Sequence, residues 1–215
     1  MSRRPRRRAR RGAVGRQRVR LSSIFPAPVR SPKVASAATH ETTMPANQRT
    51  ARVRDRRVAT DATELLRADH REVRGLFAEY AKLARARAAG SERRPLAEEI
   101  CTLLTVHAAI EEEIFYREAR AAGVDADLLD EAEVEHAAAK DLIAQIRELD
   151  AADALYDARV RVLGEYVDHH VAEEEGELFS KCRASAMDLH AVGARLASRQ
   201  AELMSEMSEG MEVVP

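Results

Sequence analysis

A histidine and a glutamate stand on the apolar stripe of a predicted helix in the segment "LLTVHAAIEEEIFY", residues 103–116. Leu103, Ile110 and Ile114 recur at helical spacing and predict the buried side of this helix. His107 and Glu111 fall on the same side, one turn apart. An unpaired carboxylate in a protein core is costly, so the fold must supply a compensating group. This requirement restricts what the chain can fold into more than any other feature.

Helical periodicity continues over most of the chain, where Ala, Leu, Glu and Arg dominate while Gly and Pro are sparse after residue 58. Gly90 and Ser91 are expected to separate the first two helices, and Gly123 to end the second. Short connections between helices of similar length predict an all-α, up-down-up-down four-helix bundle with an additional C-terminal helix. The expected helices cover about residues 61–88, 95–122, 125–149, 154–181 and, for the fifth segment, 187–204.

Charge divides the chain into two parts. Residues 1–58 carry 17 Lys and Arg against 2 Asp and Glu, whereas residues 59–215 carry 18 basic and 34 acidic residues. The basic part is predicted to be a disordered Arg-rich tail, because it has too little apolar sequence to offset the entropy of ordering. We favour an unstructured extension, with Met44 as an alternative translation start, over a nucleic-acid-binding arm or a transit peptide. Residues 59–215 are predicted to form the folded domain.

Cysteine usage and hydropathy bear on the cellular compartment. Cys101 and Cys182 form no CxxC pair, which fits a reducing compartment, and we expect a cytoplasmic protein. No apolar run approaches the length of a membrane span, so no membrane partner is expected. Nucleic acid is not favoured as a partner, and the sequence leaves the oligomeric state open.

The folded part repeats itself at the level of helix pairs. "RADHREVRGLFAEY" (67–80) aligns with "EVEHAAAKDLIAQI" (133–146), and "HAAIEEEIFY" (107–116) aligns with "HVAEEEGELF" (170–179). Each half therefore carries one histidine on its first helix and a His-x-x-x-Glu pair on its second. The two histidines are 37 residues apart in the first half and 34 in the second.

This spacing favours a metal site. Residues i and i+4 project from one face of a helix, so a His and a Glu so placed can hold the same metal centre, with the other His from the neighbouring helix. A single His-x-x-x-Glu is weak evidence in a Glu-rich domain, but here one histidine falls on each of four core stripes. The predicted metal ligands are His70, His107, Glu111, His136, His170 and Glu174.

Other polar residues near these positions receive plainer interpretations. His169 is rotated by about 100° from His170 on a helical wheel and is predicted to be peripheral. His40 and His190 fall outside the repeat. The neighbouring acids, which we expect to be solvated or to lie outside the ligand shell, are Glu112, Glu113, Glu173 and Glu175.

Taken together, these residues resemble the hemerythrin-like HHE cation-binding domains. The resemblance extends over about residues 61–204 and depends on "LLRADHREVRGLF", "LLTVHAAIEEEIFY", "EVEHAAAKDLI" and "YVDHHVAEEEGELF", with "LHAVGARLASRQAEL" similar to the C-terminal helix of the family. It implies a bundle that holds two non-haem irons with an oxo or hydroxo bridge. The four histidines of the repeat would be terminal ligands, and Glu111 and Glu174 would bridge the irons.

The sequence departs from the family pattern at three positions. Lys140 stands where oxygen-carrying hemerythrins have a further histidine, which argues against a simple oxygen carrier. Arg117 and Ser180 replace a proline that often follows the aromatic residue after each His-x-x-x-Glu stretch, so these two helices are expected to run on further.

Three functions are compatible with such a site. The first is a di-iron protein that disproportionates hydrogen peroxide, in a catalase-like reaction that defends against oxidative stress. The second is a protein that binds or senses oxygen, nitric oxide or iron without turnover. The third, a redox-sensing regulator, requires the tail to bind nucleic acid. The sequence assigns no catalytic residue. Tyr80, Tyr116 and Tyr166 are candidates to lie near the site, and packing alone explains them equally well.

Overall fold

The computed structural model describes residues 61–212, which form helices and π-turns without any strand. The predicted all-α class is therefore confirmed for this part of the chain. Residues 1–58, where the sequence predicts a disordered tail, lie outside the described residues. The elements are α2 (Ala62–Arg85), α3 (Gly90–Ile110), η2 (Glu111–Phe115), α4 (Tyr116–Ala121), α5 (Ala126–Glu148), α6 (Tyr156–Glu173), η3 (Glu174–Leu178), α7 (Phe179–Ala184) and α8 (Leu189–Glu212).

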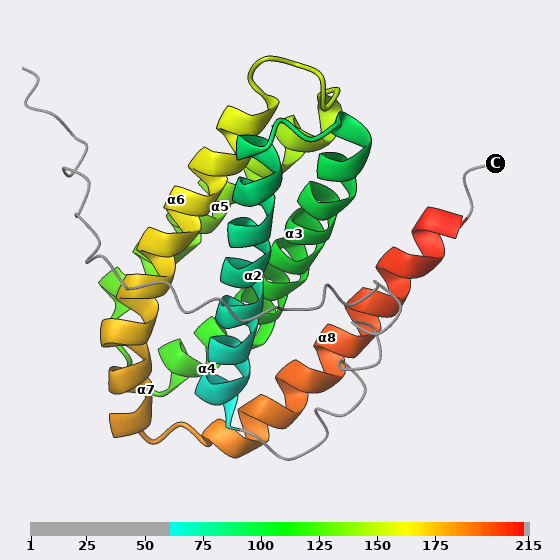
Figure 1. Ribbon diagram of the computed structural model, residues 1–215. Helices are drawn as coiled ribbons and strands as arrows, with labels where there is room; N and C mark the ends of the chain where they lie inside the picture. Colours follow the sequence, from blue (N-terminus) through cyan, green and yellow to red (C-terminus); the bar gives the residue numbers. More distant parts are fainter. Residues whose placement is uncertain (1–60, 213–215) are drawn as a thin grey trace, which may run out of the picture. The chain divides into compact units, whose positions relative to one another are not determined.

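Four helical columns make the bundle (Figure 1). They are α2, then α3 continued by η2 and α4, then α5, and finally α6 continued by η3 and α7. The helices α2 and α3 pack against each other, as do α5 and α6, so each half of the repeat forms an antiparallel hairpin. Contacts of α2 with α6 and of α3 with α5 join the two hairpins around a shared core.

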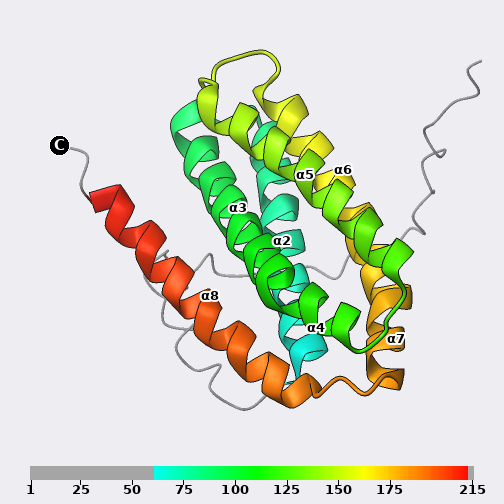
Figure 2. The same cartoon turned by 180° about the vertical axis from the view of Figure 1, so that it is seen from behind.

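The additional C-terminal helix, α8, packs on one hairpin only. It contacts α2, α3 and η2, on the side of the bundle away from α5 and α6 (Figure 2). The first hairpin is thus covered on its outer side, whereas the second is not covered by α8. Within residues 61–212, every helix is too short or too polar to span a lipid bilayer.

Helix boundaries follow local backbone preferences. The side chain of Asp61 caps the start of α2. Gly123, with φ of 73°, separates α4 from α5 as predicted. The prediction that Gly90 breaks the first helix was wrong: the turn lies earlier, with Arg87 at φ 53°, and Gly90 begins α3. A Cβ atom on Gly90 would lie 3.1 Å from the Cβ atom of Ala151, so glycine avoids a tight contact at this position.

Two π-turns interrupt helices that were predicted to be regular. Each begins at the glutamate of a His-x-x-x-Glu pair, at Glu111 and at Glu174. The backbone N–H of Tyr116 donates to the carbonyl of Glu111, and that of Phe179 donates to the carbonyl of Glu174, in both cases five residues back. Turns of this kind occur often at functional sites. Both helices continue beyond the turn, as the absence of proline led us to expect.

Two apolar clusters form the core, one at each end of the bundle. The first gathers residues from the start of α2, the end of α3, η2, α4, the start of α5, η3, α7 and α8. The second gathers residues from α2, α3, α5 and α6 nearer the loops that follow α2 and α5. Ile110 and Ile114 are buried as predicted, but Leu104, not Leu103, is the buried leucine of its pair. Along every helix of the bundle, the histidine of the repeat falls between residues of the two clusters, so a polar layer separates them.

Candidate metal centre

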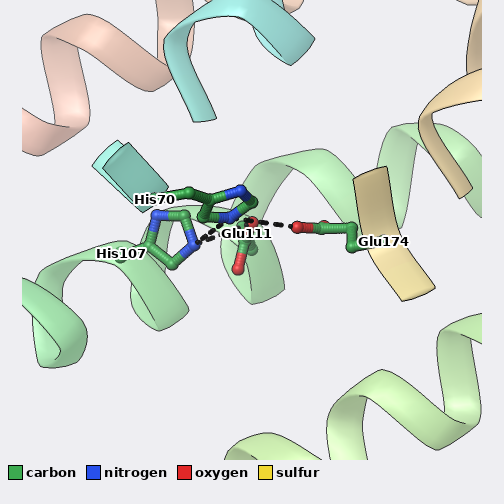
Figure 3. A group of neighbouring side chains, drawn as sticks. All are labelled: His70, His107, Glu111 and Glu174. Atoms are coloured by element: carbon green, nitrogen blue, oxygen red, sulfur yellow. Dashed lines mark hydrogen bonds and ion pairs between the residues drawn. The ribbon is translucent and has the colours of Figure 1, made fainter. Parts of the chain in front are cut away.

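The structure brings the six predicted ligands together in this polar layer. Each of α2, α3, α5 and α6 contributes one histidine, and the first residue of each π-turn contributes a glutamate. All six side chains are buried. Figure 3 shows His70 and His107 turned toward Glu111, with Glu174 reaching in from the other hairpin.

The ligand atoms fall into two groups that share the glutamates. In half-site one, the Nε2 atoms of His70 and His107 are 3.1 Å apart. The Nε2 atom of His107 lies 3.2 Å from Oε1 of Glu111, and that of His70 lies 3.3 Å from Oε2 of Glu174. Half-site one is therefore defined by His70, His107 and one oxygen of each glutamate.

Half-site two contains His136, His170 and Glu111, with Glu174 farther away. The Nε2 atoms of His136 and His170 are 3.3 Å apart, and that of His136 lies 3.3 Å from the other oxygen of Glu111, Oε2. The Nε2 atom of His170 is 3.9 Å from Oε2 of Glu174. Glu111 thus turns one oxygen to each half-site, as a bridging carboxylate would, whereas a single oxygen of Glu174, Oε2, lies near His70 and less closely near His170.

The opposite nitrogen of each histidine faces a further carboxylate. The Nδ1 atoms of His70, His136 and His170 lie 2.8–2.9 Å from Glu175, Glu112 and Glu135, respectively, and that of His107 lies 3.6 Å from Asp69. A carboxylate at Nδ1 favours a proton there, which leaves Nε2 free to bind a cation. The hydrogen bond from His136, followed by Lys140, lowers the pKa of Glu112 and keeps this partner ionised.

These outer carboxylates repeat as the ligands do. Glu112 and Glu175 each follow a predicted bridging glutamate and were expected to lie outside the ligand shell. Asp69 and Glu135 were missed, although each immediately precedes the first histidine of its half. That shared acidic position was the sequence signal for their role.

The electrostatics of the layer call for positive charge. Oε1 of Glu111 and Oε2 of Glu174 are buried and accept no hydrogen bond from the described residues. Burial alone raises the pKa of Glu111, but the charge of His107 and the close approach of His107 and His136 lower it well below its ordinary value. Burial likewise lowers the pKa of His136, yet hydrogen bonds with Glu111 and Glu112 raise it to about 9. The carboxylates thus attract protons to the imidazoles where a metal could supply the charge.

The donor set also fits metal ions by its dimensions. Atoms bound to one ion at about 2.1 Å lie about 3.0–3.4 Å from one another in octahedral or tetrahedral geometry. The neighbouring nitrogen and oxygen atoms named above are 3.1–3.3 Å apart, except for the longer contact of His170 with Glu174. Imidazole with carboxylate suits iron, manganese and zinc. The donor atoms of both half-sites could therefore hold transition-metal ions.

One tyrosine lies at the centre of the group. The hydroxyl of Tyr116 is 3.4 Å from Oε1 of Glu174, 3.5 Å from Oε2 of Glu111 and 3.4 Å from Nε2 of His136. Burial and then the charges of the two glutamates raise its pKa well above the ordinary value, so the phenol stays neutral and donates. Of the other candidates, Tyr80 donates to Asp157 instead, and Tyr166 is half exposed.

A small cavity reaches the histidines from the side of Lys140 and Tyr166. Its volume is about 40 Å³, enough for roughly three water-sized molecules. Both named residues are more than one-third exposed and stand at its solvent side. All four histidines of the repeat line it, and the remaining wall is largely aliphatic, formed by Val73, Leu104, Ala108, Ala139, Ile143, Val167 and Val171.

The fold and the site define a helical-bundle protein with clusters of buried histidines and glutamates that could hold metal ions. Comparison with known proteins agrees with this class and names the family. The sequence model of the hemerythrin HHE cation binding domain matches residues 61–182, and the chain belongs to this family. The match ends at Cys182, so α8 lies beyond it.

A solved structure shows the same fold. A hemerythrin HHE cation binding domain-containing protein from Mycobacterium kansasii superposes with a TM-score of 0.60 at 20% sequence identity. The alignment covers 72% of this chain and 93% of that protein. At this identity the likeness supports the fold alone. Among curated proteins, no sequence matches the chain significantly.

Proposed function

We propose that this domain binds two non-haem irons, with Glu111 and Glu174 as bridging ligands together with an oxo or hydroxo group. The observation that carries this proposal is the pair of half-sites, in which four Nε2 atoms converge on two shared, buried carboxylates. One oxygen of each buried carboxylate has no hydrogen-bond donor among the described residues, and two cations would supply the positive charge that compensates it. The terminal ligands are then His70, His107, His136 and His170.

We further propose that the domain disproportionates hydrogen peroxide. Paired iron ions would supply the two-electron redox chemistry that this reaction requires. The cavity admits a molecule of this size to the histidines, and its aliphatic wall favours an uncharged ligand. Because Lys140 occupies the place of a further histidine and instead pairs with Glu112, it leaves a position beside half-site two free of an imidazole.

Tyr116 is the residue of this chain best placed to handle a proton. Its hydroxyl touches both bridging carboxylates, and a neutral phenol can donate a hydrogen bond to an oxygen species held between them. Tyr156 offers a matched control, because its buried hydroxyl has no hydrogen-bond partner among the described residues and lies in the other apolar cluster. At equal iron content, Tyr116→Phe should lower oxygen release from peroxide at least about tenfold, and Tyr156→Phe should leave it unchanged.

The decisive experiment measures iron and oxygen on the same samples. Purified protein should contain close to two irons per chain and show the absorption of an oxo-bridged ferric pair. Oxygen evolution from peroxide is compared between the iron-loaded protein and His107→Ala, with a haem-absorbance check to exclude contaminating catalase. Equal rates in both, or none in either, would remove the peroxide proposal.

Reversible binding of oxygen or nitric oxide is the second candidate function. The aliphatic wall of the cavity favours it equally, because both gases are small and uncharged. A stable and reversible oxygen adduct of the reduced protein, without oxygen release from peroxide, would support this alternative. In either case we propose that the protein acts in the cytoplasm, in keeping with two buried free cysteines.

A further inference from the structure

A third group of metal-ligating side chains lies outside the six residues described above. Glu135 comes from α5, and His169 and Glu173 stand one turn apart on α6. The Nε2 atom of His169 is 3.4 Å from Oε1 of Glu135 and 3.5 Å from Oε1 of Glu173. These separations match the spacing of donor atoms around one ion with bonds of about 2.1 Å.

The internal repeat shows that this group is particular to the second half. The positions equivalent to His169 and Glu173 in the first half are Val106 and Ile110, which are both buried and apolar. In the second half the imidazole is 63% exposed and the Glu173 side chain is 42% exposed. The requirements of the inner centre therefore do not explain these two residues, because the first half builds its half-site without them.

Glu135 connects the outer group to the inner centre. Its Oε1 faces His169, while its Oε2 accepts a hydrogen bond from Nδ1 of His170 at 2.9 Å. Glu135 also lines the cavity that reaches the four inner histidines. A cation held by the outer group would thus be bound to Glu135, which also contacts His170 of half-site two. It would lie beside the cavity that leads to the inner histidines.

We propose that Glu135, His169 and Glu173 form an outer site for a divalent transition-metal ion, from which half-site two is loaded. One imidazole and two carboxylates suit Fe²⁺, Mn²⁺ and Zn²⁺, and leave the remaining positions to water. Only three protein ligands, two of them exposed, give weak and exchangeable binding, which transfer to the inner centre requires. The loading role rests on the proposed di-iron centre, whereas the binding site itself does not.

Binding at the outer site is tested with Mn²⁺ on the full chain, after its inner centre has been loaded with iron. Electron paramagnetic resonance counts the bound Mn²⁺. We expect one further ion in the wild type, and affinity more than about tenfold weaker in His169→Ala and in Glu173→Gln. His190→Ala is the matched control, because it removes an exposed histidine on α8. No further ion in the wild type, or equal affinity in His169→Ala and His190→Ala, would overturn the site.

Loading is tested by the rate at which the ferric absorption appears when Fe²⁺ and air are added to metal-free protein. His169→Ala should reach the same final iron content as the wild type, but with uptake slowed severalfold. Unchanged uptake would overturn the loading role. If the di-iron proposal itself fails, the final iron content of the wild type will be low. The Mn²⁺ measurement still tests the outer site in that case, because Mn²⁺ affinity there should depend on His169.

Discussion

The two hairpins present the same ligands to the centre but differ in what surrounds those ligands. In the first hairpin, α8 packs over the outer side, and Gln200 donates to Oδ2 of Asp69 at 2.7 Å. In the second hairpin, the equivalent carboxylate, Glu135, faces the exposed imidazole of His169. The histidines and glutamates that face the centre are thus alike in the two halves, whereas the residues around them differ.

The carboxylates beside the first histidine of each half show the same contrast. Glu175 is held by Arg67, which contacts both its side chain and its backbone carbonyl and lies over the ring of Phe179. Glu112 is held by Lys140, whose side chain is nearly half exposed. Half-site one is therefore more rigidly supported, and we expect it to bind its ion more tightly than half-site two.

The largest expected effect would come from removing a ligand that the two half-sites share. Glu111→Ala should reduce iron from about two ions per chain to nearly none, because each half-site loses a ligand and the charge that retained it. Glu112→Ala should weaken half-site two alone, since Glu112 contacts only His136 among the ligands. Metal analysis after gel filtration measures both. Loss of one ion only in Glu111→Ala would show that this glutamate does not bridge.

The next effect concerns the helix that distinguishes the hairpins. Leu196 of α8 is fully buried in the apolar cluster beside the first hairpin. Leu196→Ala should reduce the free energy of unfolding by about 2–5 kcal/mol, through lost burial and the cavity left behind. The control is Leu155→Ala, at a leucine 57% exposed, which should change it by less than about 0.5 kcal/mol. Denaturant melts of the two variants are compared, and equal midpoints would mean that α8 does not stabilise the bundle.

A smaller effect is expected where α8 reaches the centre. Gln200→Ala removes the amide that positions Asp69 against His107. Metal affinity at half-site one should fall by about tenfold, the smallest loss typical when a residue that supports a metal ligand is removed. Half-site two should keep its affinity, because α8 packs on α2, α3 and η2 rather than on α5 or α6. Competition with a chelator resolves the two ions. An equal loss at both half-sites would refute the separate roles of the hairpins.

The convergence of the six candidate ligands could be predicted from the sequence because the repeat places them in equivalent positions. A histidine on each core stripe and a glutamate one turn after two of them leave few arrangements in which the carboxylates are compensated. The bundle could also be predicted, because helical periodicity and short connections between the helices specify it. The position of Tyr116 at the centre could not be predicted, because nothing in the sequence distinguishes among three tyrosines that could lie near the site or only pack in the core.

The features that could not be predicted depend on contacts between distant segments. The π-turns at Glu111 and Glu174 depend on backbone hydrogen bonds that leave no mark in residue periodicity. The pairing of His70 with Glu175 joins residues 105 apart, and that of Asp69 with Gln200 joins residues 131 apart. Such partners follow from how the hairpins and α8 dock, which the pattern along one helix does not contain.

The smallest expected effect compares the two cations that hold the outer glutamates. Lys140 contacts both oxygens of Glu112 at 2.6 Å, but solvent screens this exposed pair, and such pairs contribute less than about 1 kcal/mol. Lys140→Ala should therefore weaken metal binding at half-site two by less than about fivefold. Arg67→Ala should weaken half-site one more, because Arg67 makes two contacts to Glu175 and both side chains are only 24% exposed. Chelator competition at low and high salt measures the difference, and only the Lys140 effect should vanish in high salt. If Lys140→Ala cost more than Arg67→Ala, half-site two would be the better supported of the two, and the contrast between the hairpins would have to be reversed.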